Sequence, residues 1–445
     1  MPVSSPPRPP RPETWSHLRT PRNNTRCTQR TKRPHPTHRT PHRAGRHPRP
    51  RLTDRLPALL PSRLASRLTP TARDDLAVLA VYLLTRALLW ATAYCATHLF
   101  PRDPRTRRAA STLSAWEQWD WWHYLRIAQE GYFPDGRGPW SEEWDNREAF
   151  FPGFPLALRA VHTVVPDWAA AGLLVSFVSG AVAVLALARI ARERLPGVTG
   201  TGRRAVLYFL LSPCAVFLAA GYTEALFLAF ALPAWLAARH RAWPRAALLA
   251  CLATTVRVSG LFLAAALLTH FLTTVRVHRD GRALPWLALP ALPLLAHTCY
   301  LYVHTGDWMA WKHAEQRGWY RDFHDPRETW SNTWDAAFGH TVGTGYALEF
   351  QAELLAMVLG LLLTAFLLYR RHWPEAVYTG LTLCALGTSY WYMSLPRATL
   401  LWWPVWTLLA VWTHRTPRAH TPYLCLTIPL TTLCALTFLT GRWAG

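Results

Sequence analysis

Long apolar runs, each close to the length of a membrane-spanning helix, alternate with short polar links along most of the chain. A helix needs roughly 20 apolar residues to cross the hydrocarbon core of a bilayer. Such runs cover residues 76–100, 167–190, 205–238, 246–272, 284–304, 349–369, 375–394, 397–413 and 422–440. The pattern predicts an all-α polytopic membrane protein.

Two of these runs do not fit a single crossing. The run 205–238 is too long for one span and carries GYTE, residues 221–224, in its middle. The run 246–272 has Arg257 at its centre, where a lone arginine costs about 2.5–3.5 kcal/mol on insertion scales. The links before, between and after these runs are rich in arginine, so the positive-inside rule makes all three cytoplasmic. Each run is therefore predicted to go out and come back, with its break forming either a turn on the outer side or a re-entrant tip below it. This gives a bundle of about 10–12 transmembrane helices.

This threading puts the conspicuous polar residues on the extracytoplasmic side, together with two long outer loops at residues 101–166 and 305–348. Those polar residues are Asp120, Glu224, Arg257 and Arg397. The basic links alone fix the threading, so the convergence of acids and arginines on one side is a physical argument for an active site there.

Composition divides the chain into two parts. Of 445 residues with a formal net charge of +22, residues 1–74 are rich in Arg, His and Pro and have few apolar positions. We expect them to form a disordered cytoplasmic tail, and residues 75–445 to form the transmembrane domain. The tail either touches anionic lipid and sets orientation, or binds nucleic acid. The first reading is favoured, so no nucleic-acid partner is expected.

Cysteine and histidine spacing gives no sign of a metal or redox site. The eight cysteines form no CxxC pair, and several lie inside apolar runs. The histidines of the tail lack the spacing of metal ligands. We therefore expect neither a metal nor a cofactor.

The first outer loop carries WDWWHYLRIAQEGY, residues 119–132. In helical register Asp120 and Tyr124 share a face, which predicts an amphipathic helix along the membrane surface. A carboxylate partly desolvated by tryptophan rings is suited to act as a general base. The alternative is that Asp120 caps the helix or forms a surface ion pair with Arg126.

Five further stretches follow that one in order. They are AFFPGFPLALR (149–159), SPCAVFLAAGYTEALF (212–227), TTVRVSGL (254–261), TGDWMAWKHAEQRGW (305–319) and SLPRATLLWWPVW (394–406). Together the six resemble the PIG-V-like mannosyltransferase family, over roughly residues 75–440. Eukaryotic members of that family add the second mannose in glycosylphosphatidylinositol anchor assembly. The Arg-rich, Lys-poor composition is similar to that of a high-GC actinobacterium, so a bacterial member is expected.

The resemblance implies a membrane glycosyltransferase of the C-type superfamily. Such enzymes move a hexosyl residue, typically mannosyl, from a polyprenyl-phosphate sugar to an acceptor hydroxyl, usually with inversion of the anomeric centre. The acceptor would be an extracytoplasmic lipid, glycan or protein. Asp120 matches the family's acidic residue in the first outer loop and is the expected catalytic base. Arg257 and Arg397 are expected to stabilise the leaving lipid phosphate.

Four other residues are expected at or near the substrates. Glu224 either orients the acceptor or pairs with Arg257, or else caps the returning helix. His123 either contacts substrate or packs against tryptophan as a hydrogen-bonding partner. Trp308 and Gln316, with two neighbouring tryptophans, either form an aromatic platform for a sugar or anchor their loop in the interface.

Two positions depart from the family pattern. Ala398 follows Arg397 where an aromatic residue is common, and Gly153 stands where a larger residue is common. Both changes put the identity of the acceptor in doubt more than the chemistry.

A transporter or lipid flippase and a non-catalytic membrane scaffold are the rival functions. A transporter predicts paired repeats and polar residues along a path through the bilayer. The predicted cytoplasmic halves of the spans are nearly free of acids, which disfavours it. A scaffold would tolerate the substitution Asp120→Asn, whereas an enzyme would not.

Overall fold

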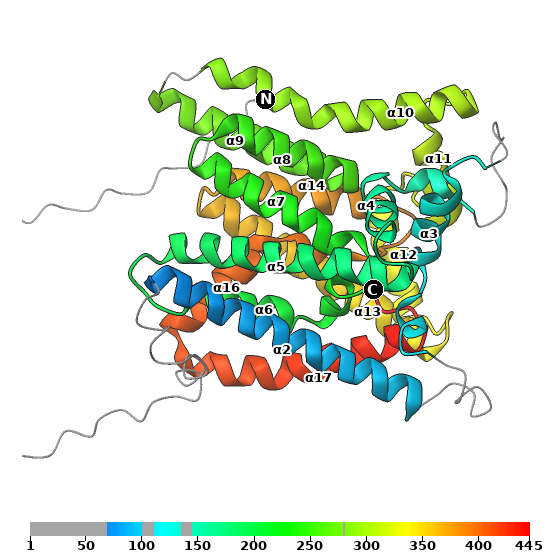
Figure 1. Cartoon of the computed structure of the whole chain (residues 1–445), viewed down its shortest axis with the longest axis horizontal. Coiled ribbons are helices and arrows are strands. Elements are labelled where there is room, and N and C mark those ends of the chain that lie inside the picture. Colours follow the sequence, from blue (N-terminus) through cyan, green and yellow to red (C-terminus); the bar gives the residue numbers. More distant parts are fainter. Residues whose placement is uncertain (1–68, 100–110, 135–144, 279–280) are drawn as a thin grey trace, which may run out of the picture. The chain divides into compact units, whose positions relative to one another are not determined.

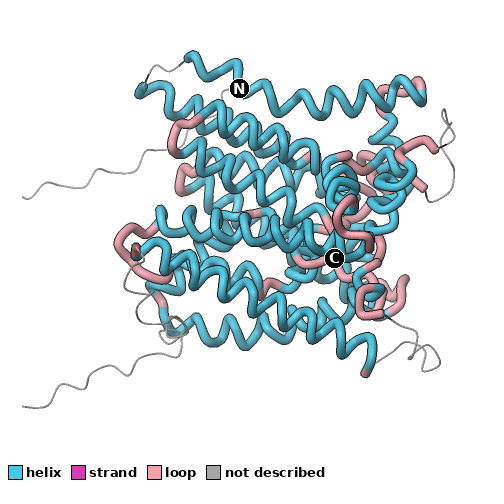
Figure 2. Tube along the Cα trace, in the orientation of Figure 1, coloured by secondary structure: helices cyan, strands magenta, loops and turns pink. Residues whose placement is uncertain are grey.

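The computed structural model describes residues 69–99, 111–134, 145–278 and 281–445, and these residues form helices and no strand (Figure 2). Contacts divide the chain into residues 1–52 and 53–445, and every described residue belongs to the second unit. The predicted tail lies outside the described residues up to residue 68. The first helix of the described residues begins at Pro70, a few residues before the first predicted span.

The helices follow one another closely along the chain (Figure 1). They are α2 (Pro70–His98), α3 (Asp120–Glu130), α4 (Gly153–His162), α5 (Trp168–Arg194), α6 (Thr201–Leu210), α7 (Thr223–Arg239), α8 (Trp243–Val256), α9 (Ser259–His278), α10 (Leu292–Thr305), α11 (Ala310–Trp319), α12 (Pro326–Phe338), α13 (Thr344–Tyr369), α14 (Trp373–Leu386), α15 (Leu395–Ala398), α16 (Trp403–Arg415) and α17 (His420–Leu439). Among the 3₁₀ segments, η6 (Pro213–Leu218) follows α6, and η7 (Gly281–Ala291) directly precedes α10.

Five helical segments of the described chain are long and apolar enough to cross a membrane. They are Thr71–His98, Trp168–Arg194, Gly281–Thr305, Thr344–Tyr369 and Pro417–Leu439. The prediction of an all-helical polytopic membrane protein is confirmed. The remaining apolar helices are shorter, so the total of about 10–12 crossings stays a prediction.

Both runs predicted to turn back are broken where the sequence indicates. In the first, α6 ends at Leu210, η6 follows from Pro213, and α7 begins only at Thr223. In the second, α8 ends at Val256 and Arg257 is extended, with φ −152° and ψ 148°. Each break leaves backbone outside the helical ladder. The second break carries Arg257, and Glu224 is the second residue of the helix that follows the first break.

The two ends of the helix bundle differ in character. Figure 1 shows α3, α4, α11 and α12 together at one end, while the links between α5 and α6 and between α7 and α8 lie at the other. At that second end, Arg194 pairs with Glu375 at 2.9 Å and Arg239 with Glu193 at 2.6 Å. The basic links predicted to be cytoplasmic are thus tied together at the end opposite the loop helices.

Candidate active site

Asp120 is the first residue of α3 and is buried, with 9% of its surface exposed. The residue before it, Trp119, has φ 51°, a left-handed conformation that non-glycine residues rarely adopt. The indole Nε1 of Trp119 donates to the carbonyl of Arg442 at 3.2 Å, and its ring meets Trp443 edge-on at 5.4 Å. These contacts stabilise the sharp entry into α3 that turns Asp120 inward.

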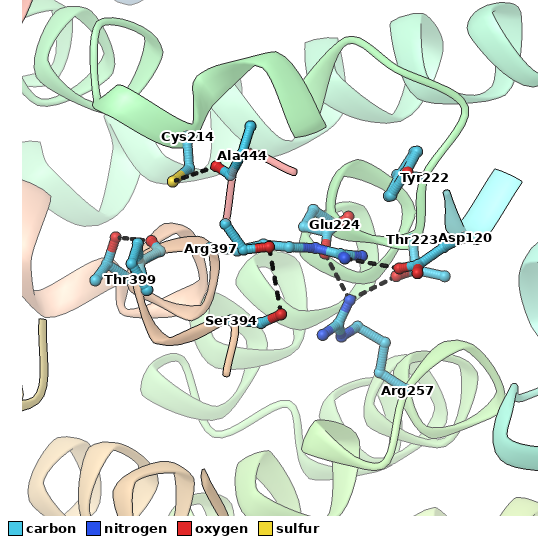
Figure 3. A network of polar contacts seen from close by, with 12 residues as sticks. Asp120, Cys214, Tyr222, Thr223, Glu224, Arg257, Ser394, Arg397, Thr399 and Ala444 are labelled. Atoms are coloured by element: carbon cyan, nitrogen blue, oxygen red, sulfur yellow. Dashed lines mark hydrogen bonds and ion pairs between the residues drawn. The ribbon is translucent and has the colours of Figure 1, made fainter. Parts of the chain in front are cut away.

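Arg397, on the short helix α15, is the partner of Asp120 (Figure 3). Its Nη1 donates to Asp120 Oδ2 at 2.7 Å. Its guanidinium carbon lies 4.8 Å from the ring centre of Phe217 and 4.9 Å from that of Tyr222, so the cation is held between two aromatic faces. The alternative pairing of Asp120 with Arg126 is wrong, because Arg126 instead pairs with Asp145 at 3.4 Å.

Glu224 joins the two arginines of the site. Its side chain is fully buried, and Oε1 accepts from Arg397 Nε at 2.5 Å and from Arg257 Nη1 at 2.6 Å. Arg257 Nη1 also donates to Thr223 Oγ1 at 2.6 Å. The predicted pairing of Glu224 with Arg257 is confirmed. Glu224 also lies in the first turn of α7, where a negative charge suits the helix dipole, so its alternative role at the start of that helix is compatible with this pairing.

The four residues form one network, which we call the Asp120–Arg257 network: Asp120, Arg397, Glu224 and Arg257 (Figure 3). They come from α3, α15, α7 and the break between α8 and α9, so segments far apart in sequence meet at one point. Two carboxylates face two guanidinium groups, and the paired charges offset the cost of burying each one alone. The network lies among the loop helices, at the end opposite the basic links.

The network leaves one carboxylate oxygen of Asp120 unused. Oδ2 is held by Arg397, whereas Oδ1 accepts no hydrogen bond from the described residues. The Asp120 side chain keeps 12% of its surface exposed. Asp120 is therefore a fixed carboxylate with one oxygen that takes no part in the network.

His123 shares α3 with Asp120 but lies in an aromatic cluster instead of the network. Its ring stacks on Phe150 at 4.7 Å and meets Trp319 edge-on at 5.6 Å. Burial lowers the pKa of His123 below its ordinary value and outweighs the opposing effect of Asp120. His123 is thus a neutral packing residue beside the site, and its expected contact with substrate stays a prediction.

Among the described residues, no hydrogen bond, ion pair or ring contact joins Trp308 or Gln316 to the network. The Trp308 ring is 54% exposed and stacks on Tyr302 at 4.0 Å. Gln316 lies on α11, and its side chain makes no hydrogen bond to the described residues. Of the predicted aromatic platform, Trp319 packs beside α3 through ring contacts with Phe150 and His123. The roles of Trp308 and Gln316 therefore stay predictions.

Gly153 has a packing reason for its small size. A Cβ atom at that position would lie 2.7 Å from the carbonyl oxygen of Thr255 on α8. The departure from the family pattern therefore lets α4 approach α8 closely, next to the break that carries Arg257. It is explained by helix packing without reference to an acceptor.

Sequence reasoning missed Glu353 of α13. Its buried carboxylate accepts hydrogen bonds from the backbone N–H groups of Ser394 and Leu395, immediately before Arg397. An acid inside an apolar run was the available signal, because such residues are costly in a membrane and usually functional.

Comparison with known proteins finds similarity to the family that the motifs resemble. The family model described as Mannosyltransferase (PIG-V) matches residues 105–280. The predicted resemblance to the PIG-V family is confirmed. Among curated relatives, GPI alpha-1,6-mannosyltransferase 2 of Mus musculus is 35% identical over 184 residues, covering 38% of this chain and 34% of the relative. Its counterpart in Homo sapiens is 34% identical over 182 residues, again covering 38% and 34%.

The chain thus matches about a third of the length of these relatives, 34% for the mouse protein. The PIG-V match includes the predicted site residues Asp120, His123, Glu224 and Arg257, and Arg397, Trp308 and Gln316 lie beyond it. Arg397 is connected to the matched part by its contacts with Asp120 and Glu224. The expected bacterial source stays a prediction.

Proposed function

We propose that this protein is a membrane glycosyltransferase that moves a mannosyl residue from a polyprenyl-phosphate donor to a hydroxyl group of a lipid, glycan or protein. The observation that carries the proposal is the Asp120–Arg257 network, in which a fixed carboxylate lies beside two arginines at the loop end of the bundle. Similarity to the PIG-V family supports the choice of a mannosyl group.

In the proposed reaction Asp120 acts as the general base. Its free Oδ1 takes the proton of the acceptor hydroxyl while that oxygen forms a bond to the anomeric carbon of the sugar. The bond from that carbon to the donor phosphate oxygen breaks, and the polyprenyl phosphate leaves with the electron pair. Attack from the face opposite the phosphate inverts the anomeric centre.

The two arginines are proposed to have different roles, one toward the base and the other toward the leaving phosphate. Arg397 has a 6% exposed side chain and uses Nε and Nη1 on the two carboxylates, so it mainly orients Asp120. Arg257 has a 26% exposed side chain and bonds within the described chain through Nη1 alone. Its remaining N–H groups are available to a phosphate, which arginine binds in bidentate fashion. Arg257 is therefore the foremost candidate to stabilise the leaving group.

The lipid-linked donor fits the position of the network. Its isoprenoid chain stays in the bilayer while the phosphate and sugar lie at the interface, where the helix ends and the loop helices meet. Holding donor and acceptor in line at such a site supplies a large part of the rate. The extracytoplasmic side is proposed for this end because the arginine-rich links lie at the other.

Purified protein in lipid, supplied with radiolabelled polyprenyl-phosphate mannose and a crude lipid and glycan extract of the host, tests this function. Wild type should transfer label, and Asp120→Asn should lose about 10²–10⁴-fold in rate while its melting temperature shows that it folds. Asp335→Asn, an exposed acid of α12 without a side-chain partner among the described residues, is the matched control and should keep full activity.

Each other outcome points to a different function. Equal transfer by wild type and Asp120→Asn would remove Asp120 as the base. A folded wild type that transfers nothing with any extract would contradict the enzyme and favour the transporter or scaffold. Inversion is checked by comparing the anomeric configuration of donor and product by NMR.

A further inference from the structure

Glu353 of α13 has both carboxylate oxygens committed to one turn of the backbone. Oε1 accepts from the N–H of Ser394 at 2.6 Å, and Oε2 accepts from the N–H of Leu395 at 2.8 Å. Glu353 is buried, with 4% of its surface exposed. A buried acid whose two oxygens accept hydrogen bonds from two adjacent N–H groups fixes that stretch of chain in place.

The turn that Glu353 holds is one that the chain does not adopt readily. Ser394 has φ 68° and ψ 21°, in the left-handed region, and α15 begins at the next residue. Arg397 follows two residues after Leu395, and its side chain points toward Asp120 and Glu224 (Figure 3). The direction of the Arg397 side chain therefore depends on the conformation at Ser394.

Helix α12 holds the segment that leads into this turn. Thr329 Oγ1 donates to the carbonyl of Ser389 at 2.7 Å, and Thr333 Oγ1 accepts from the N–H of Tyr392 at 2.9 Å. Asn332 Nδ2 donates to the carbonyl of Tyr390 at 2.9 Å. Residues 389–392 are thus fixed from one side by α12, and residues 394 and 395 by Glu353.

We propose that Glu353 is a positioning residue, which acts through Arg397 to set the orientation of the Asp120 carboxylate. The proposal rests on the proposed function, because its effect on rate is an effect on the base. Glu353 touches neither substrate nor reacting atoms. Its contribution is to hold the turn at Ser394, so that Arg397 reaches Asp120 and Glu224 together.

Two substitutions on the same helix test the contact directly. Glu353→Gln keeps one acceptor oxygen and turns an amide N–H₂ toward a backbone N–H, so one of the two hydrogen bonds is lost. Glu349→Gln, one turn earlier on α13, changes an acid that accepts no hydrogen bond within the described chain and is the control. Hydrogen–deuterium exchange of the peptide containing residues 394 and 395 should be faster in Glu353→Gln alone. Equal exchange in both variants would overturn the contact.

Kinetics test the route through Arg397. Glu353→Gln should lower kcat about 10–100-fold with little change in the KM of donor and acceptor, because misplacing the base affects the chemical step. In an Arg397→Lys background the same substitution should cost little more, because the two residues act as one unit. Losses that multiply independently would overturn the proposal.

A restored rate in Glu353→Asp, which keeps the carboxylate, would add support. A wild type that transfers no mannose would contradict the proposed function, and the exchange measurement would still decide whether Glu353 holds the turn.

Discussion

Trp121, the residue after Asp120, fills a space that two glycines leave open. A Cβ atom at Gly172 of α5 would lie 2.5 Å from the Trp121 ring, and one at Gly221 would lie 2.6 Å from it. The Trp121 side chain is 1% exposed. Glycine at both positions therefore lets this indole enter the core beside the network, with Asp120 attached to the same turn of α3.

Substitution of Gly221 should displace Trp121 and, with it, Asp120. We expect Gly221→Ala to lower the free energy of unfolding by about 1–3 kcal/mol, as overpacking of a core does. The transfer rate should fall about 10-fold or more, because the base is displaced with its helix. Gly345→Ala is the control, since a Cβ atom there meets nothing within 4 Å. Equal melting temperatures and rates in the two variants would contradict the idea that the packing of Trp121 against Gly221 positions Asp120.

His123 makes stability depend on pH in a defined direction. Its folded-state pKa is lowered, chiefly by burial, so the unfolded chain takes up a proton below about pH 6.5 and the folded protein does not. Lowering the pH from 7.5 to 5.5 therefore favours the unfolded state. His123→Phe, which retains a ring against Phe150, should show a smaller fall in melting temperature over this interval than wild type.

His324 supplies the opposite case. Hydrogen bonds to Glu328 and Asp322 raise its pKa, so its contribution to stability is present below about pH 6.5 and lost as the pH rises through the raised pKa. His324→Gln should therefore steepen the fall in melting temperature on acidification. Melting curves of both variants at the two pH values check both signs, and shifts in the same direction would refute this assignment.

Among single residues, the sequence predicted those that place a charge inside an apolar run. Arg257 in an apolar run and Glu224 in a broken one stand out because isolated charge in a membrane is costly. Glu353 did not stand out as a site residue, because its role depends on backbone N–H groups from another part of the chain. Arg86, a buried cation over the Tyr82 ring one turn earlier in α2, was not predicted either.

Among the elements, α3 is held at its C-terminal end by Arg147. Its Nη1 donates to the carbonyl of Gly131 at 2.9 Å, and its Nη2 pairs with Glu130 at 2.9 Å. Its Nε bonds to both oxygens of Asp145 at 2.9 Å. The Arg147 side chain is 8% exposed, so one buried guanidinium connects the end of α3 to residues 145–150.

Loss of the contacts made by Arg147 should weaken the attachment of α3 to residues 145–150 and so destabilise the protein. We expect Arg147→Ala to lower the free energy of unfolding by about 1–3 kcal/mol, because a backbone carbonyl and two carboxylates lose their donor. Arg126→Ala removes a 51% exposed side chain whose ion-pair partner among the described residues is Asp145, and its effect should stay below about 1 kcal/mol. Thermal unfolding in detergent compares the two, and similar losses would show that Arg147 is not the connecting residue.

The ends of helices could be predicted where an apolar run was too long for one span or contained a charged residue. The breaks at GYTE and at Arg257 follow from a run too long for one span and from an arginine inside another. The helices α11 and α12 inside the second outer loop were not predicted, because their mixed polar and aromatic pattern carries no signal on its own. The role of α12 follows from the structure, in which this helix makes hydrogen bonds to residues 389–392.

Over the described bundle, two groups of ion pairs lie at opposite ends. The Asp120–Arg257 network lies among the loop helices, and pairs such as Arg194–Glu375 and Arg239–Glu193 lie where α5 and α7 end (Figure 1). Arginine-rich links are retained in the cytoplasm during insertion, so the end that carries them sets the orientation of the other. A donor made available on the extracytoplasmic side requires this orientation.

Cysteine labelling in intact cells tests the orientation. In a background with the native cysteines replaced, Gly345→Cys at the start of α13 should react with a membrane-impermeant maleimide. Val198→Cys, in the link between α5 and α6, should react only after permeabilisation; Val198 is 38% exposed, so it is accessible once the reagent enters. The reversed pattern would place the network on the cytoplasmic side. An extracytoplasmic donor would then be excluded even if Asp120 remained essential.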